Sequence, residues 1–488
     1  MTITDLMLLT LVIPIIGALL IVLVGRWPNL RESVTLVTAL ALFGTVISVL
    51  QLANSESPQS FMLIEMLPGL SIAFHAEPLS LLFAMVASGL WIVTSVYAIG
   101  YMRGAGEQHQ TRFFACFALA LSGAMGVAFS ANLLTLFVFY EVLTLSTYPL
   151  VSHKGTDVAK QGARTYLTIL LFTSIGLLLP ALIWTYAAAG TLDFVAGGIL
   201  TGKLSPIAAS GLLCLFVLGV GKAAIMPVHR WLPAAMVAPT PVSALLHAVA
   251  VVKAGVFTIT KVIIYIFGTD FLAQVPLQEW LVYLAGFTVV AASAVALRQT
   301  NIKRLLAYST IGQLSYIVMA ALVLTPLSEL GAMTHIVAHA FGKITLFFTA
   351  GAIYVASKKT EIPQLNGIGR RMPWTMAAFA LGAFSMIGVP PTGGFISKWF
   401  MLSGAWQADN VFVLSVLVIS TGLNAAYFLP IVIRAFFRAE DHPPVKDHGE
   451  APWPMVLALS TTATLTLAFF FFHAPVVKLV QIIVGAPL

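Results

Sequence analysis

The chain has 488 residues, of which 59% are hydrophobic and only 9% are charged. A soluble globular domain carries about 25% charged residues, so this composition excludes an ordinary soluble protein. The two cysteines, Cys116 and Cys214, lie inside apolar runs, and no Cys-x-x-Cys pair exists. The usual protein ligands of iron–sulfur clusters and zinc ribbons, and the pairs of a disulfide framework, are therefore missing from the sequence, and no cofactor is expected.

Apolar runs long enough to cross a bilayer as helices, about 20 residues each, recur along the chain. Because the bilayer offers no water to an unpaired peptide group, each run is expected to be helical. The predicted fold class is an all-α polytopic membrane protein with 14 transmembrane helices. The first run has no basic flank before it and is expected to stay as a helix rather than be cleaved. The runs lie near residues 5–25, 33–52, 78–101, 112–129, 131–152, 163–189, 205–228, 239–267, 276–297, 303–325, 328–357, 373–406, 411–437 and 452–475.

The positions of the lysines and arginines predict which side of the membrane each loop faces. Eighteen of the 25 basic residues fall in loops that lead from an odd-numbered to an even-numbered helix, and one, Lys203, falls in the opposite loops. Basic loops stay on the cytoplasmic side. Both termini are therefore expected on the non-cytoplasmic side of a cell inner membrane. The net charge of +7 is a topology signal and does not indicate a nucleic-acid partner.

Five lysines fall within apolar helices instead of loops, and Glu141 is the one acidic residue predicted deep inside a span. A charge at mid-membrane costs a few kcal/mol and persists mainly where it lines a polar path. A buried lysine near a carboxylate can take up and release a proton near neutral pH, so this set predicts a proton relay. A structural contact or snorkelling is the alternative, and for Lys261, near a helix end, both interpretations stay open. The five lysines are Lys222, Lys253, Lys261, Lys343 and Lys398.

The eleventh predicted helix carries His335, His339 and Lys343 at a spacing of four residues, which places all three on nearly one face. A His-x-x-x-His pair could bind zinc, but no cysteine or carboxylate lies nearby in sequence, and the lysine would repel a cation. A polar stripe that carries protons fits all three residues. His247, in the eighth helix ahead of Lys253, is a further candidate; a hydrogen-bonded core histidine is its alternative.

Prolines mark two expected helix breaks. The seventh predicted helix ends GKAAIMPVHRWLP, and the twelfth contains GVPPTGGFISKWF, so each places a lysine near prolines and glycines. Proline removes a helix hydrogen bond, and transporters tolerate such breaks where free backbone groups line a cavity. Paired breaks, one in an inward and one in an outward helix, indicate an inverted repeat of helices 4–8 and 9–13. Ordinary kinks in a packed bundle are the alternative.

Several motifs closely resemble the antiporter-like subunits shared by Mrp-type cation/proton antiporters, respiratory complex I and membrane-bound hydrogenases. The likeness covers about residues 70–440, and by length the chain is most similar to the D-type subunit of Mrp antiporters. The matching segments are PVHRWLPAAMVAPTPVSALLH at 227–247, VKAG at 252–255, FYE at 139–141, IKRLLAYSTI at 302–311, and the stretches 335–343 and 388–398.

The resemblance implies two inverted five-helix repeats around a central hydrophilic axis. The corresponding division of the chain is 1–111 for helices 1–3, 112–275 and 276–440 for the two repeats, and 441–488 for helix 14. The resemblance further implies that Glu141 and Lys222 form a pair between helices 5 and 7. It assigns Lys253 with His335, His339 and Lys343 to the central connection, and Lys398 to the proton exit.

The sequence therefore predicts a proton-translocating subunit of a multi-subunit Mrp-type antiporter, which moves H⁺ with Na⁺ as the expected exchanged cation. Its partners would be other membrane subunits and the lipid bilayer, and it would hold no redox centre of its own. One alternative is the proton-pumping subunit of a complex I-like oxidoreductase or membrane-bound hydrogenase. Another is the membrane subunit of an inorganic-carbon uptake complex. A purely structural scaffold is disfavoured, because buried lysines cost stability without a packing benefit.

Overall fold

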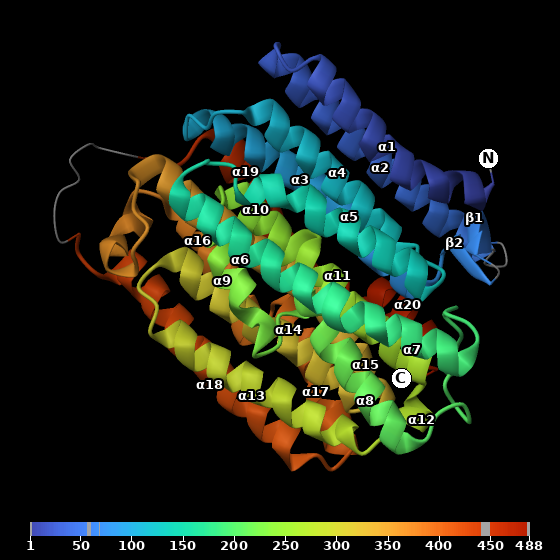
Figure 1. Cartoon of the computed structure of the whole chain (residues 1–488). Coiled ribbons are helices and arrows are strands. Elements are labelled where there is room, and N and C mark those ends of the chain that lie inside the picture. Colours follow the sequence, from blue (N-terminus) through green and yellow to red (C-terminus); the bar gives the residue numbers. More distant parts are fainter. Residues whose placement is uncertain (1, 56–59, 68, 441–448, 486–488) are drawn as a thin grey trace.

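The computed structural model describes residues 2–55, 60–67, 69–440 and 449–485. Lys446, one of the basic residues used for the predicted orientation, lies outside these ranges. Twelve helical segments among the described residues are long and apolar enough to cross a membrane. They pack into one bundle of helices that run roughly side by side (Figure 1). A polytopic membrane fold, as predicted, is confirmed.

Ten of the twelve segments are single α-helices, and two are composite. The single helices are α1 (Ile3–Leu23), α2 (Pro28–Ser55), α3 (Pro78–Gly104), α4 (Gln110–Ala128), α5 (Leu133–Val151), α13 (Leu277–Leu297), α14 (Ile302–Leu322), α15 (Pro326–Ser357), α18 (Val411–Phe437) and α19 (Trp453–Phe471). The composite segments are 157–189, which joins α6 (Asp157–Thr173) to α7 (Leu179–Ala189), and 240–267, which joins α10 (Thr240–Ala244) to α11 (Val251–Lys261). A short π-helical turn connects the pieces of each, and another, Val262–Phe267, follows α11.

The seventh and twelfth predicted spans do not form single long helices. In the seventh span, the regular helix α8 (Pro206–Gly219) ends early. The twelfth span consists of two helices, α16 (Pro373–Ile387) and α17 (Gly393–Gln407). Each piece is shorter than a full span, so none of them is among the twelve. A further short helix, α20 (Ala474–Val484), follows α19.

The first break follows α8. A 3₁₀ turn, Gly221–Ala223, places Lys222 beyond the end of the regular helix. Ala224 then has a φ of 56°, in the left-handed region, which turns the chain away from the helix axis. The chain continues through a second 3₁₀ turn, Val228–Arg230, into the short helix α9 (Trp231–Ala234).

The second break separates α16 from α17. Gly388, with a φ of 90°, caps the end of α16, a conformation that glycine adopts without steric cost. The α17 helix starts at Gly393 and crosses the end of α16 so closely that a β-carbon on Gly394 would overlap the carbonyl oxygen of Ser385. Because the last carbonyls of a helix have no partner within it, this break leaves acceptors free inside the bundle.

A β-hairpin that the sequence analysis did not predict connects α2 to α3. Its strands, β1 (Ser60–Leu67) and β2 (Leu70–His75), pair antiparallel. The backbone of β2 is tied to the α4–α5 loop, where the Ala131 amide donates to the Ala73 carbonyl at 2.9 Å. The segment was missed because a search for apolar runs of helix length does not respond to short strands.

The bundle is layered from edge to centre. Figure 1 places α1 and α2 at one edge and α13 and α18 at the opposite edge. Segment 240–267, α14 and α15 are almost entirely buried, whereas the outer helices bury about a third to a half of their residues. Segment 240–267 and α15 carry most of the ionisable residues that the sequence analysis singled out, so these side chains lie in the interior of the bundle.

The packing of α11 against the first break can be tested at Gly255. A β-carbon at this position would overlap both the carbonyl carbon of Lys222 and the amide nitrogen of Ala223. We expect Gly255→Ala to lower the free energy of unfolding by about 1–3 kcal/mol, as overpacking does, and to lower the thermal midpoint of the purified protein. Gly44→Ala on α2, where no atom lies within 4 Å, should leave the midpoint almost unchanged. Equal midpoints for the two variants would contradict this contact.

Candidate functional site

Seven of the eight residues predicted for the proton path are buried, and they come from different helices. Lys222, Lys253, Lys343 and Lys398 are at most 5% exposed, although each carries an ionisable amine. His247, His335 and His339 are fully buried as well. Glu141 is partly buried as a residue, but both of its carboxylate oxygens are buried. The site therefore consists of ionisable groups that the protein itself must solvate.

Lys222 is held by α5. Its ammonium donates to the carbonyl oxygen of Tyr140 at 2.7 Å and to the hydroxyl of Thr144 at 2.6 Å. The same ammonium lies 3.1 Å from the centre of the Tyr140 ring, and the Tyr140 hydroxyl accepts from the Lys222 backbone amide at 3.1 Å. The break after α8 thus brings the lysine against one turn of α5.

The expected pair between Glu141 and Lys222 is not a direct contact in this structure. Neither carboxylate oxygen of Glu141 has a hydrogen-bond partner among the described residues. The carboxylate interacts with Lys222 only through space. The hydrogen bonds of the ammonium go instead to the carbonyl of Tyr140 and the hydroxyl of Thr144 on the same helix.

The centre of the site joins α11 to α15. The Lys253 ammonium lies 2.6 Å from Nδ1 of His339. The rings of His339 and His335 are neighbours on α15, with centroids 6.0 Å apart. A proton on Lys253 therefore has a hydrogen-bonded acceptor on the neighbouring helix, and a second imidazole follows one turn along it.

A series of short contacts continues from His335 to Lys398. Nδ1 of His335 lies 2.8 Å from the Ser397 hydroxyl, and Nε2 lies 3.0 Å from the side-chain oxygen of Gln313. The Gln313 amide donates to the Met386 carbonyl at 3.2 Å. The Lys398 ammonium donates to that same carbonyl at 3.0 Å and to the next one, of Ile387, at 2.9 Å. The carbonyls freed by the second break therefore hold the predicted exit group.

A second polar connection runs from Lys343 toward Lys398. The Lys343 ammonium donates to the Ser309 hydroxyl at 2.8 Å, and the hydroxyls of Ser309 and Tyr427 lie 2.9 Å apart. Tyr427 donates to the side chain of Asn424, whose amide nitrogen donates to the Tyr316 hydroxyl at 3.3 Å. The Lys398 ammonium lies 4.9 Å from the centre of the Tyr316 ring. Side chains of α14 and α18 thus link the two lysines.

Sequence reasoning missed the neutral members of these connections, although a signal was present. Ser309, Gln313 and Tyr316 recur on α14 at spacings of four and three residues, which places them on one face. Ser420, Asn424 and Tyr427 repeat the same spacing on α18. Polar residues at helical spacing in otherwise apolar helices indicate a buried polar stripe.

His247 is not linked by hydrogen bonds to the rest of the site. Both of its ring nitrogens lack a partner among the described residues, and its ring packs against Phe347 with centroids 4.7 Å apart. The π-helical turn at 245–249 carries it. The interpretation of His247 as a hydrogen-bonded core histidine does not agree with this geometry, since a buried imidazole without partners is costly.

Lys261 forms a buried ion pair outside these connections. Its ammonium lies 2.7 Å from the carboxylate of Glu77 and donates to the Ser130 carbonyl at 2.8 Å. Glu77, Glu329 and Glu32 are also buried, at 7%, 6% and 6% exposure. Each sits at the start of a helix, so none of them lies deep inside a span. Among the two interpretations of Lys261, this pair favours the structural one.

Comparison with known families accounts for this arrangement. The family described as "NADH:quinone oxidoreductase/Mrp antiporter, TM" matches residues 130–424, which include α5, both breaks and all the predicted site residues. The chain belongs to this family. A second family, described as the N-terminus of chain 5 of complex I, matches residues 68–114.

The relatives of this antiporter-like protein include NADH-quinone oxidoreductase subunits and an antiporter subunit. NADH-quinone oxidoreductase subunit N of Desulforudis audaxviator is 32% identical over 79% of this chain and 77% of its own length. A probable K⁺/H⁺ antiporter subunit of the A/B type, from Rhizobium meliloti, is also 32% identical over 79% of this chain, but the match covers only 39% of that protein.

Two solved structures show the same fold. A chain of the Mrp complex from Dietzia sp. superposes with a TM-score of 0.88 at 20% identity, covering 99% of this chain and 97% of that one. A chain of an archaeal membrane-bound sulfane sulfur reductase superposes with a TM-score of 0.85 at 23% identity, covering 98% and 97%. The protein is therefore an antiporter-like membrane subunit of the kind found in Mrp or complex I-like assemblies.

Glu141 provides the first functional test of this antiporter-like protein. Its carboxylate interacts with Lys222 through space, and Glu141→Gln removes this interaction, so we expect the variant to reduce proton transport by about tenfold or more while the protein still folds and assembles. Transport is measured as proton movement in membrane vesicles with matched protein levels. Glu279→Gln, on the exposed face of α13, is the matched control and should transport normally. Wild-type transport by Glu141→Gln would contradict a role for the carboxylate.

Lys398 provides the second test. Lys398→Ala removes the titratable group, and Lys398→Arg keeps the charge but holds its proton at physiological pH. We therefore expect both variants to lose transport by about tenfold or more, although both keep the helix. Lys478→Arg on α20, an exposed position, is the control for the lysine-to-arginine change. An active Lys398→Arg protein would show that the ammonium does not release protons.

Proposed function

We propose that this chain is the proton-translocating subunit of a multi-subunit Mrp-type monovalent cation/proton antiporter. The observation that carries the proposal is the series of contacts from Lys253 to Lys398. It passes through His339, His335 and Gln313 to the Met386 carbonyl. A structural scaffold would have no use for this chain of buried ionisable groups, each of which costs stability in a membrane.

The proposed mechanism assigns a role to each predicted residue. Lys222, under the influence of Glu141, would take up a proton near the first break. Lys253, His339 and His335 would pass protons through the centre. Lys343 would be a further ionisable group of this central connection. Lys398 would release the proton beside the second break, where free backbone carbonyls can hold water. His247 would supply a further titratable ring near Lys343.

The proposed architecture is that of fourteen spans with two inverted repeats. If α8 with its following turn counts as one broken span, and α16 with α17 as another, the described residues contain these two in addition to the twelve long segments. Helices 4–8, in residues 112–275, and helices 9–13, in residues 276–440, would then form the repeats. The two breaks support this division, because one lies in the seventh span and the other in the twelfth. A buried lysine lies next to each break.

The fold agrees with the Mrp assignment. The superposition on a chain of the Mrp complex covers 99% of this chain and 97% of the other, at a TM-score of 0.88 against 0.85 for the sulfane sulfur reductase chain. The probable K⁺/H⁺ antiporter relative is a second point of support, at 32% identity. We propose Na⁺ as the exchanged cation, and other membrane subunits of the same complex as partners.

A second candidate function is the proton-pumping subunit of a complex I-like oxidoreductase. The observation that favours it is the relative named as NADH-quinone oxidoreductase subunit N, which matches over 77% of its own length against 39% for the antiporter relative. The two functions differ in what drives proton movement. An antiporter exchanges protons for a cation, whereas an oxidoreductase couples proton movement to electron transfer.

The experiment that separates the two uses inverted membrane vesicles that contain the full complex, with a fluorescent dye that reports ΔpH. For an antiporter, adding Na⁺ should dissipate a proton gradient built by respiration, and vesicles with Lys398→Ala should fail to respond. Repeating the assay with K⁺ in place of Na⁺ shows which cation is exchanged. If Na⁺ and K⁺ have no effect, and Lys398→Ala instead reduces the gradient built by a redox substrate, the oxidoreductase function is the right one.

The proposed orientation places the basic loops in the cytoplasm and both termini outside. In a variant whose Cys116 and Cys214 are replaced by serine, we expect Gln364→Cys to resist a membrane-impermeant thiol reagent in intact cells, because this exposed position lies between the basic residues of the 358–371 loop. Lys203→Cys, exposed on the opposite side, is the matched control and should be labelled. The reverse labelling pattern would overturn the orientation.

A further inference from the structure

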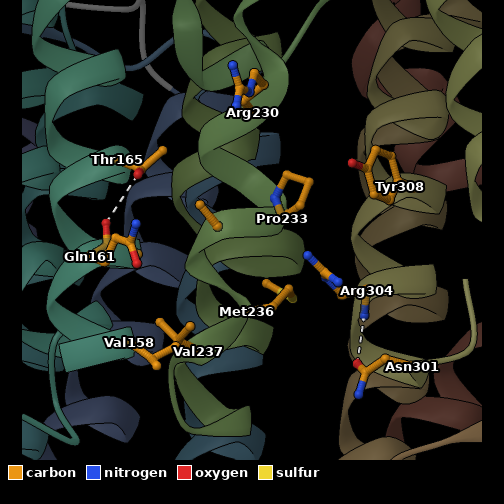
Figure 2. Close-up of a pocket in the computed structure, with 12 residues that line it drawn as sticks. Val158, Gln161, Thr165, Arg230, Pro233, Met236, Val237, Asn301, Arg304 and Tyr308 are labelled. Carbon is orange, nitrogen blue, oxygen red and sulfur yellow. Dashed lines mark hydrogen bonds between the residues drawn. The ribbon is translucent and has the colours of Figure 1, made fainter. Parts of the chain in front are cut away.

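A polar pocket outside the proton path opens between α6, α9 and α14. Its volume is about 640 Å³. Figure 2 shows Gln161 and Thr165 on α6 at one wall, and Asn301, Arg304 and Tyr308 on α14 at the other. The segment that follows the first helix break lies between these walls and adds a second guanidinium to the lining, that of Arg230.

The pocket lies at the ends of its helices. Its α6 lining spans residues 158–165, and its α14 lining ends at Tyr308, so both sets fall within the first nine residues of helices that begin at Asp157 and Ile302. At 1.5 Å per residue, this is a depth of about 12 Å from the helix starts. In a membrane-spanning helix, such a position corresponds to the lipid headgroup region and the outermost part of the hydrocarbon.

Two positive charges line the pocket without a direct counter-ion. Arg230 and Arg304 are both exposed. Neither guanidinium takes part in an ion pair within 4 Å or a side-chain hydrogen bond in the part of the chain that the structure describes, and Glu361 acts on Arg304 only through space. Guanidinium groups bind phosphate oxygens in a bidentate manner, and the side-chain amides of Gln161 and Asn301 can complete the contacts.

The remaining lining is apolar. Val158 lies on the α6 wall and is 66% exposed, and Pro233, Met236 and Val237 belong to the segment between the two walls. A site with two guanidiniums and an apolar side suits an amphiphile better than a fully hydrated ion. Basic pockets between helices on the cytoplasmic side of a membrane bind anionic lipid headgroups in this way.

We propose that this pocket binds an anionic phospholipid, with its phosphate between Arg230 and Arg304 and the first part of an acyl chain along Val158 and Val237. The bound lipid would contact the segment that follows the first break directly. It would therefore restrain the segment on one side of Lys222, independently of which ion the protein exchanges.

The test uses the full-length protein, purified in mild neutral detergent with the subunits that co-purify, and fluorescently labelled phosphatidylglycerol as the probe. We expect saturable binding that Arg230→Gln and Arg304→Gln each weaken by about tenfold, because each removes a charge-assisted contact to phosphate. Labelled phosphatidylcholine should bind wild type and variants equally weakly. Arg298→Gln, which removes an exposed arginine outside the pocket, is the matched control and should bind like wild type.

Three outcomes would overturn the proposal. One is equal binding of phosphatidylglycerol by Arg304→Gln and Arg298→Gln. Another is complete displacement of the probe by inorganic phosphate, which would show a site for small anions. A third is that a photo-crosslinking residue at Val237 captures a co-purifying protein instead of lipid in native membranes. Thr165→Trp fills the pocket without a change of charge and should abolish binding as well, so the test does not depend on the arginine variants alone.

Discussion

A charged amine inside a membrane bundle must be solvated by the protein, and this constraint explains most of the unusual features of the chain. The Lys398 ammonium is held by two carbonyls, of Met386 and Ile387, that only the end of a helix leaves free. The Lys222 ammonium is held by a carbonyl and a hydroxyl of α5, which it reaches because α8 has already ended. The helix breaks and the buried lysines therefore depend on one another.

The same constraint shapes the region between the breaks. One connection runs through His339, His335 and Gln313. The other runs through Ser309, Tyr427 and Tyr316. Most polar groups in these connections have a hydrogen-bond partner, but Nε2 of His339 is buried without one among the described residues. Both connections end at Lys398, so the protonation of this residue is open to influence from two directions.

Close packing makes the short contacts of the site available. The backbone of α11 touches the first break at Gly255, and α17 touches the end of α16 at Gly394. In membranes, where apolar side chains gain little by leaving lipid, small residues that let backbones approach are a main source of helix association. Gly255 lets the helix that carries Lys253 approach the turn that carries Lys222, and Gly394 lets the helix that carries Lys398 approach the end of α16.

The sequence by itself determined the elements and the inventory of the site. Runs of apolar residues located the spans, prolines and glycines located the two breaks, and lysines and histidines in apolar helices identified the buried ionisable groups. These features are local, because hydropathy, helix termination and the cost of a buried charge depend on a residue and its near neighbours. The motifs that resemble the antiporter-like subunits are local as well, and the family comparison confirmed them.

Only the tertiary structure decided which of these groups meet. It brought Lys253 to His339 and paired Lys261 with Glu77, but it left Glu141 and Lys222 without a direct contact. It also supplied the neutral partners, such as Gln313, that complete the path. These outcomes depend on how each helix is rotated and how deeply it sits against its neighbours, which is set by packing over the whole bundle. Residue spacing along a single helix does not contain that information.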